Sequence, residues 1–467
     1  MTVSVKQSPR PEEKPVPEEK PDSGADLLKN RLVAGIFKSR WFPGILQWPT
    51  AIVFIFIMYI LLFGPTLAHS NFGTALTWIL WWPLIPIIFV LVGRFWCAVC
   101  PFGTLNDVVQ KYVGHNRPIP KFLRNYGIWV IDGMFILITW GDHVFGMVES
   151  PWGTGVLMLM ITTAVVGTAV LWERRSWCRY LCFLGGLSSN YSQTGMLALR
   201  GTPETCSKCK VSACYKGNEE IPGCPMFEFP RTMDSNAQCN LCGLCVKSCP
   251  NDSITLKTRI ATKELWSVRK PQFAASFLAV VIMGIVFVQS FTMLEVWQSI
   301  LSGLENFLGT DSFFVTFTVT FLITLSIPII LLSLVSFLAK KANGASLVEN
   351  FTRFGYAIIA LDVAGHIAHN LFHLFAEGGT LYITGAAFFG KTVENISPAI
   401  LDDMTIQILQ YGLIALGVAG SLYTAYRISK SNFPNKKWAT LLPYGILILF
   451  LGVINIILFS LPMAMRM

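Results

Sequence analysis

The stretch Cys239-Asn-Leu-Cys242-Gly-Leu-Cys245-Val-Lys-Ser-Cys249-Pro250 decides how the whole chain is interpreted. Its spacing, Cys-x2-Cys-x2-Cys-x3-Cys-Pro, is the bacterial ferredoxin pattern for a [4Fe-4S] cluster. Three thiolates on one tight loop can hold one face of a cluster, and the fourth cysteine ligates the neighbouring cluster in two-cluster ferredoxins. The sequence therefore predicts one-electron redox chemistry in this region.

A second group of four cysteines precedes this stretch, with spacings of x2, x4 and x9. The two-cluster rule divides the eight cysteines into two [4Fe-4S] ligand sets. Cluster A takes Cys206, Cys209, Cys214 and Cys249, and cluster B takes Cys239, Cys242, Cys245 and Cys224. The alternatives are zinc, which would favour two Cys-x2-Cys pairs, and disulfides, which need an oxidising compartment.

The composition indicates a multi-pass membrane protein, because 53% of the 467 residues are hydrophobic and only 13% are charged. Nine apolar runs are long enough to span a bilayer. We expect them at roughly 46–63, 74–93, 126–145, 154–172, 272–294, 312–338, 354–376, 405–426 and 439–461. The fold class is then an all-α polytopic protein with a small inserted α+β ferredoxin-like domain.

The basic residues orient these spans. If the N-terminus is cytoplasmic, 34 of the 36 Lys and Arg residues fall inside, and only Lys391 and Arg466 fall outside. This asymmetry follows the positive-inside rule. It predicts a bacterial inner-membrane protein with a cytoplasmic N-terminus, a cytoplasmic ferredoxin domain and an outer C-terminus. The net charge of +9 is thereby explained without nucleic acid.

Four regions follow from these patterns. A polar, Pro- and Glu-rich segment at 1–40 is expected to be a disordered cytoplasmic tail. Residues 41–182 form a four-span core, 183–270 the dicluster ferredoxin domain, and 271–467 a five-span membrane module.

The four-span core contains an internal repeat. Arg94-Phe-Trp-Cys97-Ala-Val-Cys100 and Arg175-Ser-Trp-Cys178-Arg-Tyr-Leu-Cys182 each follow a span that runs from outside to inside. The two cysteine pairs are therefore expected to meet at the inner membrane face. Four thiolates there could hold a third [4Fe-4S] cluster or another soft metal such as copper or zinc. They could also be redox-active dithiols or inert buried cysteines.

Two hairpins, paired cysteine motifs and a double ferredoxin motif together resemble the NapH, NosR and CcoG type of membrane polyferredoxin. The resemblance covers roughly residues 45–265. It implies electron delivery, often from quinol, towards a partner on the outer side. The pairs differ from the usual Cys-x3-Cys-Pro of that family, since the first is one residue shorter and the second lacks the proline.

A row of ionisable residues lies in the seventh expected span, outside the resemblance. Asp362, His366, His369, His373 and Glu377 recur at helical spacing and share one face. Ionisable side chains inside a bilayer are candidates for function. The row, with His143 or His69 as further ligands, could bind b-type haem, could bind copper, zinc or iron, or could line a quinol or proton path. The alternative is a polar contact between helices.

Together these features predict an integral membrane iron–sulfur electron-transfer protein, an oxidoreductase subunit or electron carrier. Its donor would be cytoplasmic or a quinol, and its acceptor a redox partner on the outer side. Two other functions remain open: a metal-handling protein that reduces copper or iron, and a redox-sensing regulator.

Overall fold

A computed structural model of the chain describes residues 24–393 and 396–462. The predicted tail therefore lies outside the described residues as far as residue 23. Within residues 24–40, which were expected to belong to the disordered tail, the structure has η1 (Leu27–Lys29) and α1 (Arg31–Lys38). The apolar core of the ferredoxin region contacts three apolar side chains of this segment, Leu27, Leu28 and Phe37. These contacts bury apolar surface that the segment could not bury by itself.

Nine helical runs in the described part of the chain are long and apolar enough to cross a membrane, which confirms the number expected. Eight of them are continuous helices. They are α2 (Gly44–Phe63), α7 (Lys121–Phe145), α8 (Pro151–Leu171), α15 (Phe273–Thr292), α17 (Phe313–Asn343), α18 (Leu347–Ala376), α20 (Asp403–Asn432) and α21 (Lys437–Ser460), the last preceded by η6 (Pro434–Lys436).

The second run, Phe72–Val113, is broken into short pieces. It comprises α3 (Phe72–Thr74), the π-helical η3 (Ala75–Trp81), α4 (Trp82–Val92), η4 (Gly93–Phe95), α5 (Trp96–Val99) and α6 (Pro101–Val113). Gly93 takes a positive φ of 61°, which glycine tolerates without steric cost, and this ends α4 just before the first cysteine pair. The short elements η2 (Ala68–Ser70), α16 (Trp297–Leu308) and α19 (Gly379–Phe388) lie elsewhere in the membrane part.

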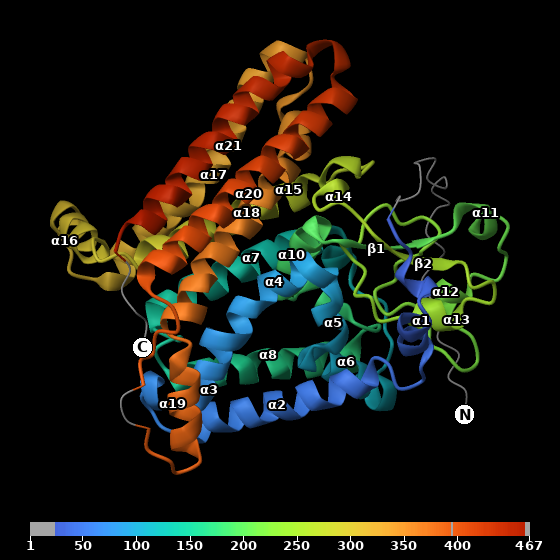
Figure 1. The fold of residues 1–467 in the computed structure, drawn as a ribbon, viewed down its shortest axis with the longest axis horizontal. Helices are drawn as coiled ribbons and strands as arrows, with labels where there is room; N and C mark the ends of the chain where they lie inside the picture. Colours follow the sequence, from blue (N-terminus) through green and yellow to red (C-terminus); the bar gives the residue numbers. More distant parts are fainter. Residues whose placement is uncertain (1–23, 394–395, 463–467) are drawn as a thin grey trace. The chain divides into compact units, whose positions relative to one another are not determined.

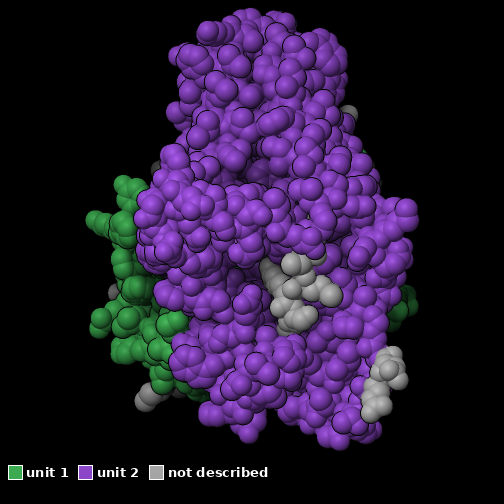
Figure 2. Space-filling model, turned by 90° about the vertical axis from the view of Figure 1, so that its left-hand side faces the viewer, with its two compact units in different colours: residues 1–55, 88–131, 160–269 green, residues 56–87, 132–159, 270–467 purple. Residues whose placement is uncertain are grey.

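The chain divides into two compact units, coloured separately in Figure 2. Unit 1 consists of 1–55, 88–131 and 160–269, and unit 2 of 56–87, 132–159 and 270–467. The helices α2, α4, α7 and α8 each contribute residues to both units. The compact units thus group the chain differently from the regions expected at 41–182, 183–270 and 271–467.

Unit 2 contains a helical bundle of α15, α17, α18, α20 and α21 (Figure 1). The central helices are α15 and α18, with 78% and 72% of their apolar windows buried. Small residues let the backbones approach closely: a Cβ added at Gly417 in α20 would lie 2.5 Å from the Cβ of Ala364 in α18. Ionisable residues on α18 are consequently enclosed by other helices.

Unit 1 contains the two-stranded antiparallel sheet of β1 (Leu197–Gly201) and β2 (Ile254–Thr258), with Leu199 opposite Leu256. Short helices connect the cysteines around it. They are α9 (Ser176–Tyr180), α10 (Phe183–Tyr191), η5 (Ser192–Thr194), α11 (Pro203–Cys206), α12 (Ala213–Lys216), α13 (Leu244–Ser248) and α14 (Lys263–Ser267). This confirms the predicted mostly helical fold with a small mixed cysteine region.

Candidate functional site

The structure brings together the four cysteines assigned to cluster A. The hydroxyl of Ser253 lies 3.6 Å from the sulfur of Cys206 and 3.4 Å from the sulfur of Cys249. Burial raises the pKa of Cys214 to about 12, and the nearby charges of Cys249, Cys206 and Cys209 add to the shift. We call this group of four, Cys206, Cys209, Cys214 and Cys249, site A.

The four cysteines assigned to cluster B also converge, and we call this group site B. Burial raises the pKa of Cys224, and the charges of Cys242 and Cys239 contribute. The pKa of Cys245 is raised well above its usual value by burial and by the charges of Cys239, Cys242 and Cys224. Cys224 is distant from the other three cysteines in the sequence, but the fold brings it next to them.

The loop of site B turns its backbone amides toward the sulfurs. Leu241 and Gly243 both have positive φ angles, 54° and 75°. Burial raises the pKa of Cys239 to about 12, although the amide of Leu241 donates a hydrogen bond to the Cys239 sulfur and opposes this shift. Such concave rows of N–H groups stabilise anions. The loop is therefore built for negatively charged sulfur.

Each site brings together four thiols, which is the donor set of a [4Fe-4S] cluster. Buried thiols whose pKa values are raised deprotonate only with a compensating cation, which coordinated iron provides.

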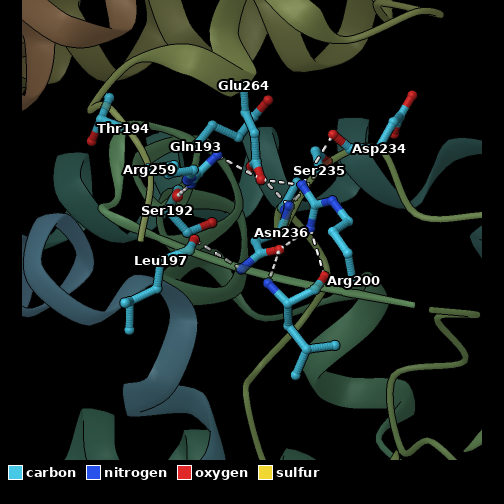
Figure 3. A network of polar contacts seen from close by, with 12 residues as sticks. Ser192, Gln193, Thr194, Leu197, Arg200, Asp234, Ser235, Asn236, Arg259 and Glu264 are labelled. Atoms are coloured by element: carbon cyan, nitrogen blue, oxygen red, sulfur yellow. Dashed lines mark hydrogen bonds and ion pairs between the residues drawn. The ribbon is translucent and has the colours of Figure 1, made fainter. Parts of the chain in front are cut away.

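A buried ionic network holds the start of the site B loop (Figure 3). The Glu264 carboxylate pairs with Arg200 and with Arg259, the latter at 2.5 Å. Its second oxygen accepts the backbone N–H of Asn236 at 2.8 Å, and the Asn236 carbonyl accepts the N–H of Cys239 at 2.9 Å. The network thus ties β1 and α14 to the first ligand of site B.

The two cysteine pairs of the repeat meet in unit 1, and we call this group the third site. Cys178 is buried, and Cys100 and Cys182 pack against the same apolar cluster. The pKa of Cys182 is raised well above its usual value by burial and by the charges of Cys178, Cys100 and Cys97. Each cysteine of this group is therefore close to the other three.

Two arginines connect the two copies of the repeat reciprocally. Arg94 Nη2 donates to the carbonyl oxygen of Cys178 at 3.1 Å, and Arg175 Nη1 donates to the carbonyl oxygen of Cys97 at 2.8 Å. Each guanidinium also approaches a sulfur of its own copy: Arg94 Nε lies 3.4 Å from Cys97, and Arg175 Nη1 lies 4.0 Å from Cys178. The third site is thus framed by two cations in a pseudo-twofold arrangement.

A glycine in each copy makes room for the arginine of the other. A Cβ added at Gly103 would overlap the Arg175 guanidinium, and one at Gly185 would lie 3.1 Å from Arg94 Nη2. Each glycine stands three residues after the second cysteine of its copy. The repeat is therefore Arg-x2-Cys, then Cys-x2-Gly, in both copies.

The two arginines differ in what neutralises them. Both are buried, with 1% of Arg94 and 2% of Arg175 exposed. Asp107 accepts two hydrogen bonds from Arg175, at 3.0 and 2.5 Å. Burial lowers the pKa of Arg175, but the Asp107 carboxylate more than offsets this and raises it overall. Arg94 instead donates to the carbonyl oxygen of Ala237 at 3.0 Å and to Gln238 at 2.8 Å, and no described carboxylate pairs with it.

Shared apolar clusters place site B between the other two sites. One cluster surrounds cysteines of sites A and B: Cys214, Cys239, Cys245 and Cys249. Another surrounds cysteines of site B and the third site: Cys224, Cys100, Cys178 and Cys182. Arg94 reinforces this second connection, because Ala237 and Gln238 directly precede Cys239.

The ionisable row of α18 lies inside unit 2. Its members, Asp362, His366, His369, His373 and Glu377, are each no more than 1% exposed. His369 Nδ1 lies 3.2 Å from the Ser290 hydroxyl of α15, and His373 Nδ1 lies 3.1 Å from Glu377. The ring of His366 lies 6.2 Å from that of Trp82. All five side chains of the row are therefore enclosed within the helices of unit 2.

The two further histidines differ from this row. His143 accepts or donates a hydrogen bond with Thr292 of α15 at 3.4 Å and stacks on Phe317. His69 is exposed in η2.

The sequence analysis did not single out Arg94, Arg175 or Ser253 as site residues. For the two arginines a signal was present, because they precede the first cysteine by three residues in both copies of the repeat. Ser253 carries no comparable pattern. Its role depends on the β2 backbone returning next to Cys206.

Two protein-family models, both described as a 4Fe-4S binding domain, match the chain. One matches 74–120 and 154–193, which include both cysteine pairs of the repeat, and the other matches 235–255. No solved structure matches the chain.

Two curated relatives from Escherichia coli (strain K12) are similar to the chain. "Putative electron transport protein YccM" is 28% identical over 46% of the chain and 64% of its own length. "Ferredoxin-type protein NapH" is 23% identical over 38% of the chain and 66% of its own length. The chain therefore spans slightly under two thirds of each relative. It is a multi-pass membrane protein with 4Fe-4S binding domains and a distant homologue of NapH and YccM.

Proposed function

We propose that this protein transfers electrons at a membrane through three [4Fe-4S] sites, arranged in the order site A, site B, third site. The observation that carries the proposal is that the twelve cysteines lie in three groups of four within unit 1. When bound, the clusters supply one-electron donor and acceptor centres. The polypeptide sets their order, because site B shares one apolar cluster with each neighbour.

The charge around the third site supports a cluster rather than a dithiol or inert cysteines. A buried cation is expensive unless an anion pairs with it. Arg94 has no such partner among the described residues, and its guanidinium lies 3.4 Å from the Cys97 sulfur and donates to the carbonyl oxygen of Cys178. A [4Fe-4S] cluster with four thiolates is anionic and would supply the missing charge. The match of a 4Fe-4S family model across both cysteine pairs agrees with this assignment.

The charge distribution supports the orientation we propose. The loop that carries sites A and B is basic, and the positive-inside rule places it in the cytoplasm. The donor would then be a cytoplasmic carrier or a quinol, and the acceptor would lie on the outer side. The names of the two relatives, an electron transport protein and a ferredoxin-type protein, are consistent with this role.

Transfer to the outer side needs a carrier within the bilayer, whose apolar core is about 30 Å thick. We propose that the ionisable row of α18 serves this step, either as ligands of a haem or as proton acceptors for a quinol. Ser290 and Glu377 would hold the ring orientations of His369 and His373, because each lies within hydrogen-bond distance of a ring nitrogen.

Proteoliposomes test the proposal. Vesicles carrying the protein would enclose ferricyanide, and membrane-impermeant dithionite would be added outside. We expect the clusters to be reduced and the enclosed ferricyanide to lose its absorbance. A Cys245→Ser variant, which lacks a ligand of the middle site, should reduce ferricyanide at the rate of empty vesicles.

A different result would reject the transmembrane part of the proposal. If the clusters are reduced in the wild type but the enclosed ferricyanide stays oxidised, electrons enter the protein without crossing the bilayer. A Cys245→Ser variant as fast as the wild type would show that the route bypasses site B.

A further inference from the structure

A basic cavity of about 240 Å3 opens beside site A in unit 1. It lies between β1, the segment around residues 230–234, and the end of β2 with α14. Its wall carries six cationic and three acidic side chains among sixteen residues. The cations are Arg200, Arg231, Lys257, Arg259, Lys263 and Arg269.

The cavity wall adjoins the cysteines of site A. A Cβ added at Gly201 would lie 2.7 Å from the sulfur of Cys206, so only a glycine backbone separates the cavity from site A. Arg231 donates to the carbonyl oxygen of Ser207, the residue after this ligand, at 3.2 Å. A group seated in the cavity would therefore lie next to site A.

Two of the cations are available to a partner. Arg231 and Lys257 are partly exposed and have no carboxylate partner in residues 24–393 and 396–462. Arg200 and Arg259, in contrast, share the buried carboxylate of Glu264 (Figure 3). Part of the cavity wall is thus fixed by ion pairs, and Arg231 and Lys257 add positive charge that no described carboxylate pairs with.

The size of the cavity limits what can enter it. Pockets for small molecules and cofactors usually have volumes of about 300–1,000 Å3. A cavity of about 240 Å3 is too small for a whole dinucleotide or flavin nucleotide, but it accepts the carboxylate side chains of a docked protein. Positive charge at such a surface attracts a negatively charged partner and raises its association rate.

We propose that this cavity is the docking site of a small acidic electron-carrier protein, which exchanges electrons with site A. The proposal rests on the function proposed above and adds the class of partner and the place of entry. One electron passes between the carrier and site A, with no bond formed or broken. Lys257 and Arg231 would pair with carboxylates of the carrier.

Stopped-flow reduction of the purified full chain tests the proposal. The donors would be a reduced acidic [4Fe-4S] ferredoxin and, separately, the methyl viologen radical cation, with cluster bleaching as the readout. We expect Lys257→Glu to slow reduction by the ferredoxin about tenfold at low salt. The matched control is Lys216→Glu, an exposed cation of the same region outside the cavity, which should stay close to the wild-type rate. Methyl viologen should reduce all three proteins equally fast.

Other outcomes would overturn the proposal. Equal slowing by both lysine variants would mean that general charge, not this cavity, attracts the carrier. Slowing of Lys257→Glu with methyl viologen as well would mean damage to the site. If Lys257→Glu and the wild type are reduced by the ferredoxin at the same rate in nanodiscs of anionic lipid, the cavity binds lipid headgroups and not the carrier. If the ferredoxin fails and methyl viologen succeeds with the wild type, the docking proposal fails while electron transfer stands; if both donors fail, the proposed function fails.

Discussion

Arg94 and Arg175 occupy equivalent positions in the two copies of the cysteine-pair repeat, three residues before the first cysteine, but they are neutralised differently. Arg175 pairs with the Asp107 carboxylate, which it shares with Arg174, and Arg94 donates only to neutral oxygens and a sulfur. The cation of the second copy is therefore neutralised by a carboxylate on α6, which follows the cysteine pair of the first copy. In the function proposed above, Arg94 is balanced instead by an anion at the third site, and Arg94 also contacts the segment that precedes Cys239.

This difference suggests how a symmetric repeat can transfer electrons preferentially to one neighbouring site. Arg94, Arg175 and the two glycines surround the four cysteines of the third site almost symmetrically. The contact of Arg94 with the site B loop breaks that symmetry. Arg94 both faces the third site and donates to the two residues that precede Cys239. The following substitutions test the role of each copy of the repeat by itself.

The largest effect is expected from Asp107→Asn, which removes the carboxylate that neutralises Arg175. Arg175 would remain buried and charged without its partner, and breaking such a pair costs about 3 kcal/mol. The midpoint of cluster loss during chemical denaturation should fall accordingly. The matched control is Arg174→Gln, which removes a more exposed partner of the same carboxylate and should cost less than about 1 kcal/mol. Equal effects of the two variants would contradict the importance of the buried pair.

Arg94→Gln tests the other copy. If the third site supplies the anion that balances Arg94, removing this cation should lower the reduction potential of the third site by on the order of 100 mV. The conservative Arg94→Lys variant keeps the charge and should remain near the wild-type potential. Spectroelectrochemical titration of both variants provides the comparison. Equal shifts in Gln and Lys variants would show that the shape of the guanidinium, and not its charge, matters.

A smaller effect is expected from Gly185→Ala. The added Cβ would lie 2.7 Å from the carbonyl oxygen of Cys178 and 3.1 Å from Arg94 Nη2, so backbone and guanidinium must shift. We expect a loss of about 1–2 kcal/mol in stability, as for other overpacked sites. Gly167→Ala in α8 is the control, because no heavy atom lies within 4 Å of its added Cβ. A control that loses as much stability would place the cause in the helices rather than in the repeat.

Much of this could be predicted from the sequence. Hydropathy was sufficient for the nine spans, and the ferredoxin spacing predicted the grouping of Cys224 with Cys239, Cys242 and Cys245 that the structure forms. The first of these signals is local in the sequence. The second follows the rule that the fourth cysteine of each ferredoxin motif ligates the cluster of the other motif. Helical spacing likewise predicted the shared face of the α18 row.

Other features depend on contacts between distant segments, which no local pattern encodes. The crossed hydrogen bonds of Arg94 and Arg175 require both copies of the repeat in place. Ordering of residues 24–40 requires the apolar core that Leu27 and Phe37 join. The cavity beside Gly201 exists only because β1 and β2 pair.

Iron content measured together with electron paramagnetic resonance tests the central claim most directly. The wild type should contain about twelve iron atoms per chain, and a Cys178→Ser/Cys182→Ser variant about eight, with loss of one of three reducible signals. About eight iron atoms and two signals in both proteins would contradict the third site, and with it the role assigned to Arg94.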